Sequence, residues 1–127
     1  MLGMTALHHV AVCVTDLERS KRFYGEVLGF TEIARPAFKA GGTWYELPDG
    51  SQLHLILHAG TRTLRGTTAV DILDGHFAIR VKDFEAAVAH LRSHGVEIFE
   101  LPHNVTAWKQ VYFTDPDGNE IELNVDR

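Results

Sequence analysis

Apolar and polar side chains alternate along four stretches of the chain, and a period of two is typical of half-buried β-strands. In residues 7–14 the side chains of Val10, Val12 and Val14 share one face, and the residues between them face the other way. The same alternation is found at 51–58, 75–82 and 119–125. Four shorter strands are expected at 30–35, 43–47, 96–100 and 109–114.

Two helices are expected from apolar stripes that follow the first strand and the strand at 75–82. Thr15 is predicted to be the N-cap of the first helix, because Glu18 completes a capping box with it. Asp83 is the predicted N-cap of the second helix. Gly29 and Gly95 stand where a glycine with positive φ ends a helix.

The chain contains an internal repeat. The segment that begins at His9 resembles the one that begins at His76, and the segment around the turn at 48–50 resembles the one at 116–118. The sequence therefore predicts an α+β fold of two tandem β-α-β-β-β modules, with curved mixed sheets and helices on the convex face. We expect modules at about 7–58 and 75–125 within a single domain, 1–127, and a loop at 59–74.

Composition excludes several classes of protein. The formal net charge is −5, which disfavours a nucleic-acid partner, because phosphate binding needs clustered Lys and Arg. No apolar run approaches the roughly 20 residues of a membrane span, and the N-terminus lacks the pattern of a signal peptide. The single Cys13 cannot form an internal disulfide. These features favour the cytoplasm.

Strand alternation places a residue able to bind a metal ion on the face opposite the apolar side chains in four strands. These residues occupy repeat-equivalent positions: His9 matches His76, and His54 matches Glu122. Three imidazoles and one carboxylate suit a divalent ion such as Fe, Ni, Mn, Co or Zn. They do not suit Ca, which prefers oxygen ligands. The pattern predicts that the four residues surround one ion.

The motifs at these residues resemble the vicinal oxygen chelate superfamily, which includes glyoxalases, bleomycin-resistance proteins and extradiol dioxygenases. They are LHHVAV at 7–12, DLERSKRFY at 16–24, LGF at 28–30, HFAIRV at 76–81 and DPDGNEIEL at 115–123. The similarity covers roughly residues 7–125. These motifs are specific for the fold and poorly specific for the reaction.

The resemblance implies paired β-α-β-β-β modules, usually a homodimer, and a small-molecule substrate. It also implies that the metal ligands map to His9, His54, His76 and Glu122. Glyoxalase I relatives often have Glu at the position of His54, whereas epimerase relatives often have Gln. The histidine at this position therefore leaves the subfamily open.

A six-coordinate ion with four protein ligands keeps two positions for substrate oxygens and acts as a Lewis acid. A tetrahedral zinc ion would instead be closed by the same four ligands. In glyoxalase-like members the carboxylate ligand can serve as the base, which makes Glu122 the predicted catalytic residue. His54 is the other candidate for the base.

The ligand face carries further candidates for the cleft. Tyr112 and Gln110 share one face of the strand at 109–114 and are candidate substrate contacts. Trp44 can wall the pocket and Arg80 can bind an anionic group, although packing or an ion pair would equally explain them. His8 is expected to point away from His9.

The leading functional interpretation is a divalent-metal-dependent, glyoxalase-like lyase or isomerase acting on a small oxygenated substrate. One alternative is an Fe(II)-dependent extradiol-type dioxygenase, for which the resemblance supplies the ligands His9, His76 and Glu122. The other alternative is a protein that binds or modifies an antibiotic.

Overall fold

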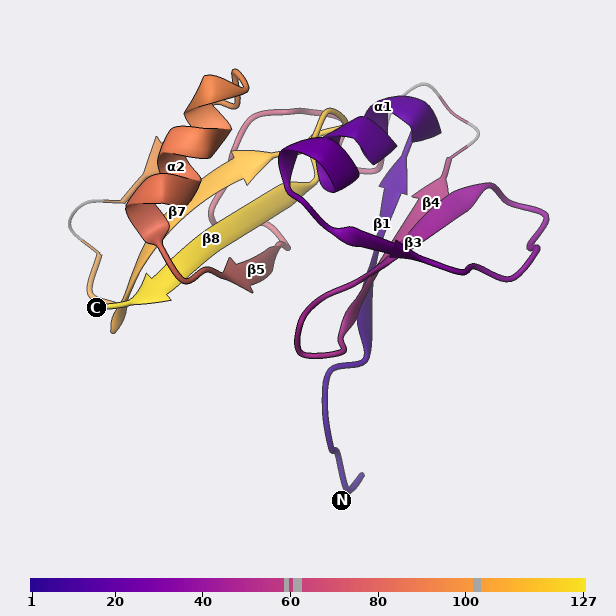
Figure 1. Cartoon of the computed structure of the whole chain (residues 1–127), viewed down its shortest axis with the longest axis horizontal. Helices are drawn as coiled ribbons and strands as arrows, with labels where there is room; N and C mark the ends of the chain where they lie inside the picture. The colour runs from indigo at the N-terminus through magenta and orange to yellow at the C-terminus, as the bar shows by residue number, and fades with distance from the viewer. Residues whose placement is uncertain (59, 61–62, 102–103) are drawn as a thin grey trace. The chain divides into compact units, whose positions relative to one another are not determined.

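The computed structural model describes residues 1–58, 60, 63–101 and 104–127 of the chain (Figure 1). The chain divides into two compact units, Met1–Thr61 and Arg62–Arg127. The predicted loop at 59–74 lies partly outside the described residues. Its described part contains turns and no strand or helix.

Unit 1 is a four-stranded mixed sheet with one helical segment inserted after the first strand. The strand order is β1-β4-β3-β2, in which β1 runs parallel to β4 and the other neighbours are antiparallel. The elements are β1 (His9–Val14), α1 (Leu17–Lys21), the π-helical η1 (Arg22–Val27), β2 (Thr31–Ile33), β3 (Gly42–Glu46) and β4 (Gln52–Leu57).

Unit 2 repeats this topology with the order β5-β8-β7-β6, and β5 is parallel to β8. The elements are β5 (Phe77–Arg80), α2 (Phe84–Ser93), β6 (Phe99–Glu100), β7 (Trp108–Thr114) and β8 (Glu120–Asp126). The α+β fold of two tandem β-α-β-β-β modules with mixed sheets is therefore confirmed. Strand β5 is shorter than the predicted strand at 75–82.

The register of the strands confirms the predicted faces. In unit 1, Val10 lies opposite Leu53 and Val12 opposite Leu55 on the core face, so Ala11 and His54 share the other face. The core of this unit is made of residues from the helical segment and three strands: Val14, Phe23, Tyr24, Tyr45, Leu53 and Leu55.

Unit 2 is built in the same way. Helix α2 packs on β8, and its buried side chains are Val88 and Leu91. Phe77 pairs with Ile121 on the core face, so Ala78 and Glu122 share the opposite face. The remaining core residues come from the two long strands: Val111, Phe113, Ile121 and Leu123.

The helix ends agree with the sequence in three places and differ in one. Asp83 is the N-cap of α2, and Gly29 and Gly95 have φ values of 77° and 74° after the helices. The N-cap of α1 is Asp16 and not Thr15. The carboxylate of Asp16 accepts the third backbone N–H of the helix, which a charged group does well at a helix N-terminus.

In the described part of the chain, no helix is long and apolar enough to cross a membrane.

Candidate metal centre

In unit 1 the structure brings His9 and His54 together. His9 is exposed at the start of β1, and His54 is buried, with 8% of its surface exposed, in the neighbouring strand β4. Their rings are stacked, with centroids 4.2 Å apart and an interplanar angle of 17°. His54 pairs with Ala11, two residues after His9, so His9 and His54 lie on the same face of the sheet.

The position of His54 is fixed by two further contacts. The indole of Trp44 lies opposite it in β3 and stacks on its other side, with centroids 4.0 Å apart and an angle of 5°. Its Nε2 atom lies 2.8 Å from Oε1 of Gln52. Burial, followed by the nearby cationic groups His9, His8 and Arg35, lowers the pKa of His54. The neutral imidazole that metal binding requires is therefore favoured.

The expectation that His8 points away from His9 is wrong. The Nδ1 atoms of the two rings lie 2.8 Å apart, and the ring centroids are 5.1 Å apart in an edge-to-face arrangement. The reason is that β1 begins only at His9, so the strand alternation used for the prediction does not extend to His8.

In unit 2 the structure brings His76 and Glu122 together. Nε2 of His76 lies 3.4 Å from Oε2 of Glu122, which is 6% exposed. Nδ1 of the same ring is 2.9 Å from the backbone oxygen of Asp74. A carbonyl oxygen only accepts hydrogen bonds, so Nδ1 carries the proton. In the neutral ring Nε2 then has a lone pair, and this lone pair faces the carboxylate.

Three side chains donate hydrogen bonds to the Glu122 carboxylate. Its Oε1 accepts hydrogen bonds from Nε1 of Trp108 at 3.1 Å and Nδ2 of Asn124 at 2.8 Å. Its Oε2 accepts from the hydroxyl of Tyr112 at 3.2 Å. The sequence did not predict the role of Trp108, because the strand was expected to begin at 109. If the alternation is extended by one residue toward the N-terminus, Trp108 falls on the same face as Gln110 and Tyr112.

Gln110 and Tyr112 form a buried chain of hydrogen bonds that leads to Glu122. Nε2 of Gln110 donates to the Tyr112 hydroxyl at 2.6 Å, and Oε1 of Gln110 accepts from Asn104 and Thr106. Burial and then the Glu122 carboxylate raise the pKa of Tyr112, which keeps its phenol protonated. In this structure both residues orient the carboxylate, and a contact with substrate stays a prediction.

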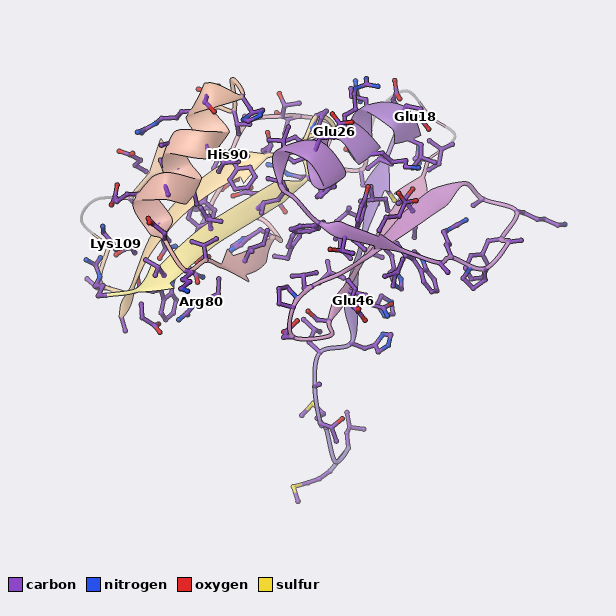
Figure 2. All side chains as sticks on the ribbon, in the orientation of Figure 1. Glu18, Glu26, Glu46, Arg80, His90 and Lys109 are labelled. Atoms are coloured by element: carbon purple, nitrogen blue, oxygen red, sulfur yellow. The ribbon has the colours of Figure 1, made fainter. Side chains whose placement is uncertain are left out.

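The other two predicted substrate contacts have protein partners. Trp44 stacks on His54 and lies 6.0 Å, centroid to centroid, from Phe38. Arg80 projects from β5 (Figure 2), donates through Nε to Asn124 at 2.8 Å and forms an ion pair with Asp126. Because Asn124 also donates to Glu122, Arg80 is connected to the site through one intermediate side chain.

The four predicted ligands therefore lie as two pairs, one in each unit. Among the residues that the structure describes, no group of three or more His, Cys, Asp or Glu side chains could hold a metal ion. The donors themselves fit a divalent transition metal, since neutral imidazole and carboxylate are ligands that such ions accept. In unit 2, Nε2 of His76 and a carboxylate oxygen of Glu122 already face each other.

Residues 6–123 match the family model of the Glyoxalase/Bleomycin resistance protein/Dioxygenase superfamily. Uncharacterized protein YaeR of Escherichia coli is 30% identical over 97% of this chain and 98% of its own length. Glyoxylase I 4 of Arabidopsis thaliana is 29% identical over 96% of this chain and 71% of its own length. Catechol-2,3-dioxygenase of Bacillus subtilis is 32% identical over 98% of this chain, but only 45% of that enzyme is covered.

Solved structures share the fold. A glyoxalase/dioxygenase from Nostoc punctiforme superposes with a TM-score of 0.81 at 26% identity, covering 98% of this chain and 93% of the other. A mutant of the fosfomycin resistance protein FosX from Listeria monocytogenes superposes with a TM-score of 0.73 at 18% identity, covering 100% and 95%. That protein was solved in complex with Mn(II) and 1S,2S-dihydroxypropylphosphonic acid.

Proposed function

Since the chain belongs to the Glyoxalase/Bleomycin resistance protein/Dioxygenase superfamily, we propose that it is a divalent-metal-dependent lyase or isomerase acting on a small oxygenated substrate. The superfamily match does not distinguish among its reactions, because relatives include a glyoxylase and a catechol dioxygenase. The proposal therefore rests on the candidate ligands themselves.

The observation that carries the proposal is the arrangement of His76 and Glu122. In the neutral ring the proton lies on Nδ1, toward the oxygen of Asp74, so the lone pair of Nε2 and an oxygen of the carboxylate converge at 3.4 Å. Two acceptors that face each other repel unless a proton or a cation lies between them. A divalent ion would relieve this repulsion and would use both atoms as ligands.

In our proposal His9, His54, His76 and Glu122 bind one ion of Ni, Co, Zn, Mn or Fe. This requires the pairs of the two units to meet, either in one chain or between the chains of a homodimer. When bound, the ion would polarise a substrate carbonyl or stabilise an enediolate as a Lewis acid. We place the protein in the cytoplasm.

The residues around Glu122 have distinct roles in this proposal. Glu122 is the candidate base, and the hydroxyl of Tyr112 and the indole N–H of Trp108 orient its two oxygens. His54, whose imidazole could accept a proton if it left the ion, is the second candidate for moving the proton.

Elemental mass spectrometry of the protein without a His-tag tests the proposal. We expect about one metal ion per chain, and its loss in H9A and in E122Q. H94A is the matched control, since His94 is an exposed histidine at the end of α2. Absence of bound metal after reconstitution with each of the five ions would refute the proposal.

One observation favours a second candidate, an Fe(II)-dependent extradiol-type dioxygenase. Nε2 of His54 already contacts Gln52, and its ring is stacked between His9 and Trp44. If His54 keeps these contacts, the remaining ligands are His9, His76 and Glu122, which is the iron-binding set that the family resemblance implies for extradiol enzymes. Bound iron together with oxygen consumption on catechols would select this function.

The third function, binding or modification of an antibiotic, is tested in the same preparations. A metallothiol transferase, FosB of Staphylococcus epidermidis, is 28% identical over 97% of this chain. Turnover of fosfomycin with a thiol in the metal-loaded protein would support this function and exclude the lyase.

A further inference from the structure

Within unit 2, the side chain of Arg65 joins the segment before β5 to the turn that leads into β8. Only 13% of this side chain is exposed, although it belongs to the stretch that the sequence identifies as a loop. Its Nε atom donates to Asp74 at 2.7 Å, and its two Nη atoms donate to the backbone oxygens of Gly118 and Ala69. A guanidinium can hold several acceptors at once because its five N–H groups form a rigid fork.

Arg65 also faces a buried carboxylate. Oε2 of Glu120 lies 3.5 Å from Nη2 of Arg65, and the Glu120 side chain is fully buried. The same oxygen accepts the backbone N–H of Asp71 at 3.1 Å, whereas Oε1 has no hydrogen-bond partner among the described residues. A buried charge is tolerated only beside a counter-charge, so this contact fixes Arg65 in place.

Close packing of the backbone supports the same attachment. Gly118 has a φ of +86°, and a Cβ atom there would clash with the backbone oxygen of Thr67. The hydroxyl of Thr63 donates to the oxygen of Asp117 at 2.9 Å, and that of Thr114 donates to the oxygen of Thr68 at 3.1 Å. The segment 63–74 therefore lies directly on the turn that leads into β8.

Arg65 thus connects the two segments that come just before the candidate ligands of unit 2, His76 and Glu122. Asp74 precedes His76 by two residues and accepts the proton of its Nδ1. Gly118 and Glu120 precede Glu122 at the start of β8. Because β5 and β8 are parallel, both strands start at the same end of the sheet.

We propose that Arg65 is a positioning residue for His76. By holding Asp74 against the turn before β8, it keeps the backbone oxygen of Asp74 on Nδ1 of His76, so that Nε2 carries the lone pair and faces Glu122. This proposal rests on the proposed function in that it treats His76 as a metal ligand. A partner that fixes the tautomer of a liganding histidine commonly changes metal affinity by about 10–100-fold when removed.

The test uses the whole chain without metal and reads the tautomer directly. Histidine ring ¹⁵N spectra at about pH 8, above the ordinary histidine pKa, distinguish protonated Nδ1 from protonated Nε2. We expect His76 to be Nδ1-protonated in the wild type and mixed in R65Q. D74A should give the same change. This variant leaves Arg65 beside the buried Glu120 carboxylate, so we expect it to fold as the wild type does. R92Q is the matched control, because it breaks the exposed Arg92–Glu100 pair of the same unit.

Co(II) titration followed by absorbance gives the second readout. We expect about 10-fold or greater weakening in R65Q and D74A and no change in R92Q. The proposal is overturned if both variants keep wild-type proportions of the His76 tautomers. If the wild type binds no Co(II) while the tautomer still changes in the variants, the proposed function fails and the positioning role of Arg65 stands.

Discussion

The two units have one topology and opposite ways of holding their candidate ligands. In unit 1, His54 is held mainly by ring stacking, against Trp44 on one side and His9 on the other. In unit 2, Glu122 is held by hydrogen bonds from three side chains and faces His76. The aromatic residue opposite the ligand is at an equivalent position in both, Trp44 in β3 and Tyr112 in β7.

The duplicated fold therefore decides where a candidate ligand lies, and the charge of that side chain decides which groups must surround it. A neutral imidazole can be fixed by packing alone, which costs little when the partner is an aromatic ring. A buried carboxylate requires donors, so the equivalent aromatic residue in unit 2 has a hydroxyl. Four predictions test this comparison.

The largest effect is expected when each ligand is removed. E122A should lower the free energy of unfolding by about 3 kcal/mol, because it leaves several buried donors unpaired. H54A should cost only about 1 kcal/mol, since it removes stacking and one exchangeable hydrogen bond. Urea denaturation of the metal-free proteins measures both. Equal losses would mean that the two ligands are held in the same way.

The second prediction concerns Tyr45 and its equivalent in unit 2, Phe113. Burial, then Glu32 and Glu18, raises the pKa of Tyr45 from 10.0 to about 12. Between these pH values the unfolded chain loses the proton while the folded chain keeps it. The unfolded state then binds fewer protons, so stability falls as the pH rises.

Y45F, which copies unit 2, should abolish this loss of about 2 kcal/mol between about pH 10 and 12. At neutral pH it should be neutral or slightly stabilising, because the Tyr45 hydroxyl has no hydrogen-bond partner in the described part of the chain. Chemical denaturation at several pH values compares Y45F with the wild type. If the stability of Y45F and of the wild type fell in the same way at alkaline pH, the Tyr45 hydroxyl would not be buried and unpaired.

The third prediction is about the donor to Glu122. Y112F removes one hydrogen bond to the carboxylate and leaves Nε2 of Gln110 without its acceptor. We expect metal affinity to fall about 10-fold, the lower limit for loss of a residue that orients a ligand. Isothermal titration with Co(II) measures the change, and an unaltered affinity would make Tyr112 a substrate contact only.

The smallest effect is expected at the equivalent position in unit 1. W44F keeps an aromatic ring on His54 and should cost less than about 1 kcal/mol in metal binding. The same titration compares it directly with Y112F. A larger loss of metal affinity in W44F than in Y112F would mean that stacking on His54 matters more than the hydrogen bond to Glu122.

The sequence predicted the two modules and the faces of their strands, because alternation and the internal repeat are local properties of the chain. It also identified His9, His54, His76 and Glu122 as candidate ligands, but the contacts of His9 with His54 and of His76 with Glu122 came from the structure. It could not predict the partners that orient them. Whether four ligands share one ion stays a prediction.

The residues that were missed have different physical reasons. Trp108 lies one position beyond the predicted strand, and Arg65 acts through contacts with a turn more than fifty residues away. The N-cap at Asp16 was decided by which of two adjacent oxygens reaches the helix. The contacts of Arg65 depend on where a loop and a turn meet in space, which no periodicity encodes.

The chain has only two tryptophans, and each touches a candidate ligand of a different unit. Trp44 stacks on His54, and Trp108 donates to Glu122. The protein therefore carries two built-in fluorophores, one for each half of the duplicated fold. Emission from W108F would report on the histidine pair and emission from W44F on the carboxylate, so that a quenching metal could be followed as it reaches each half separately.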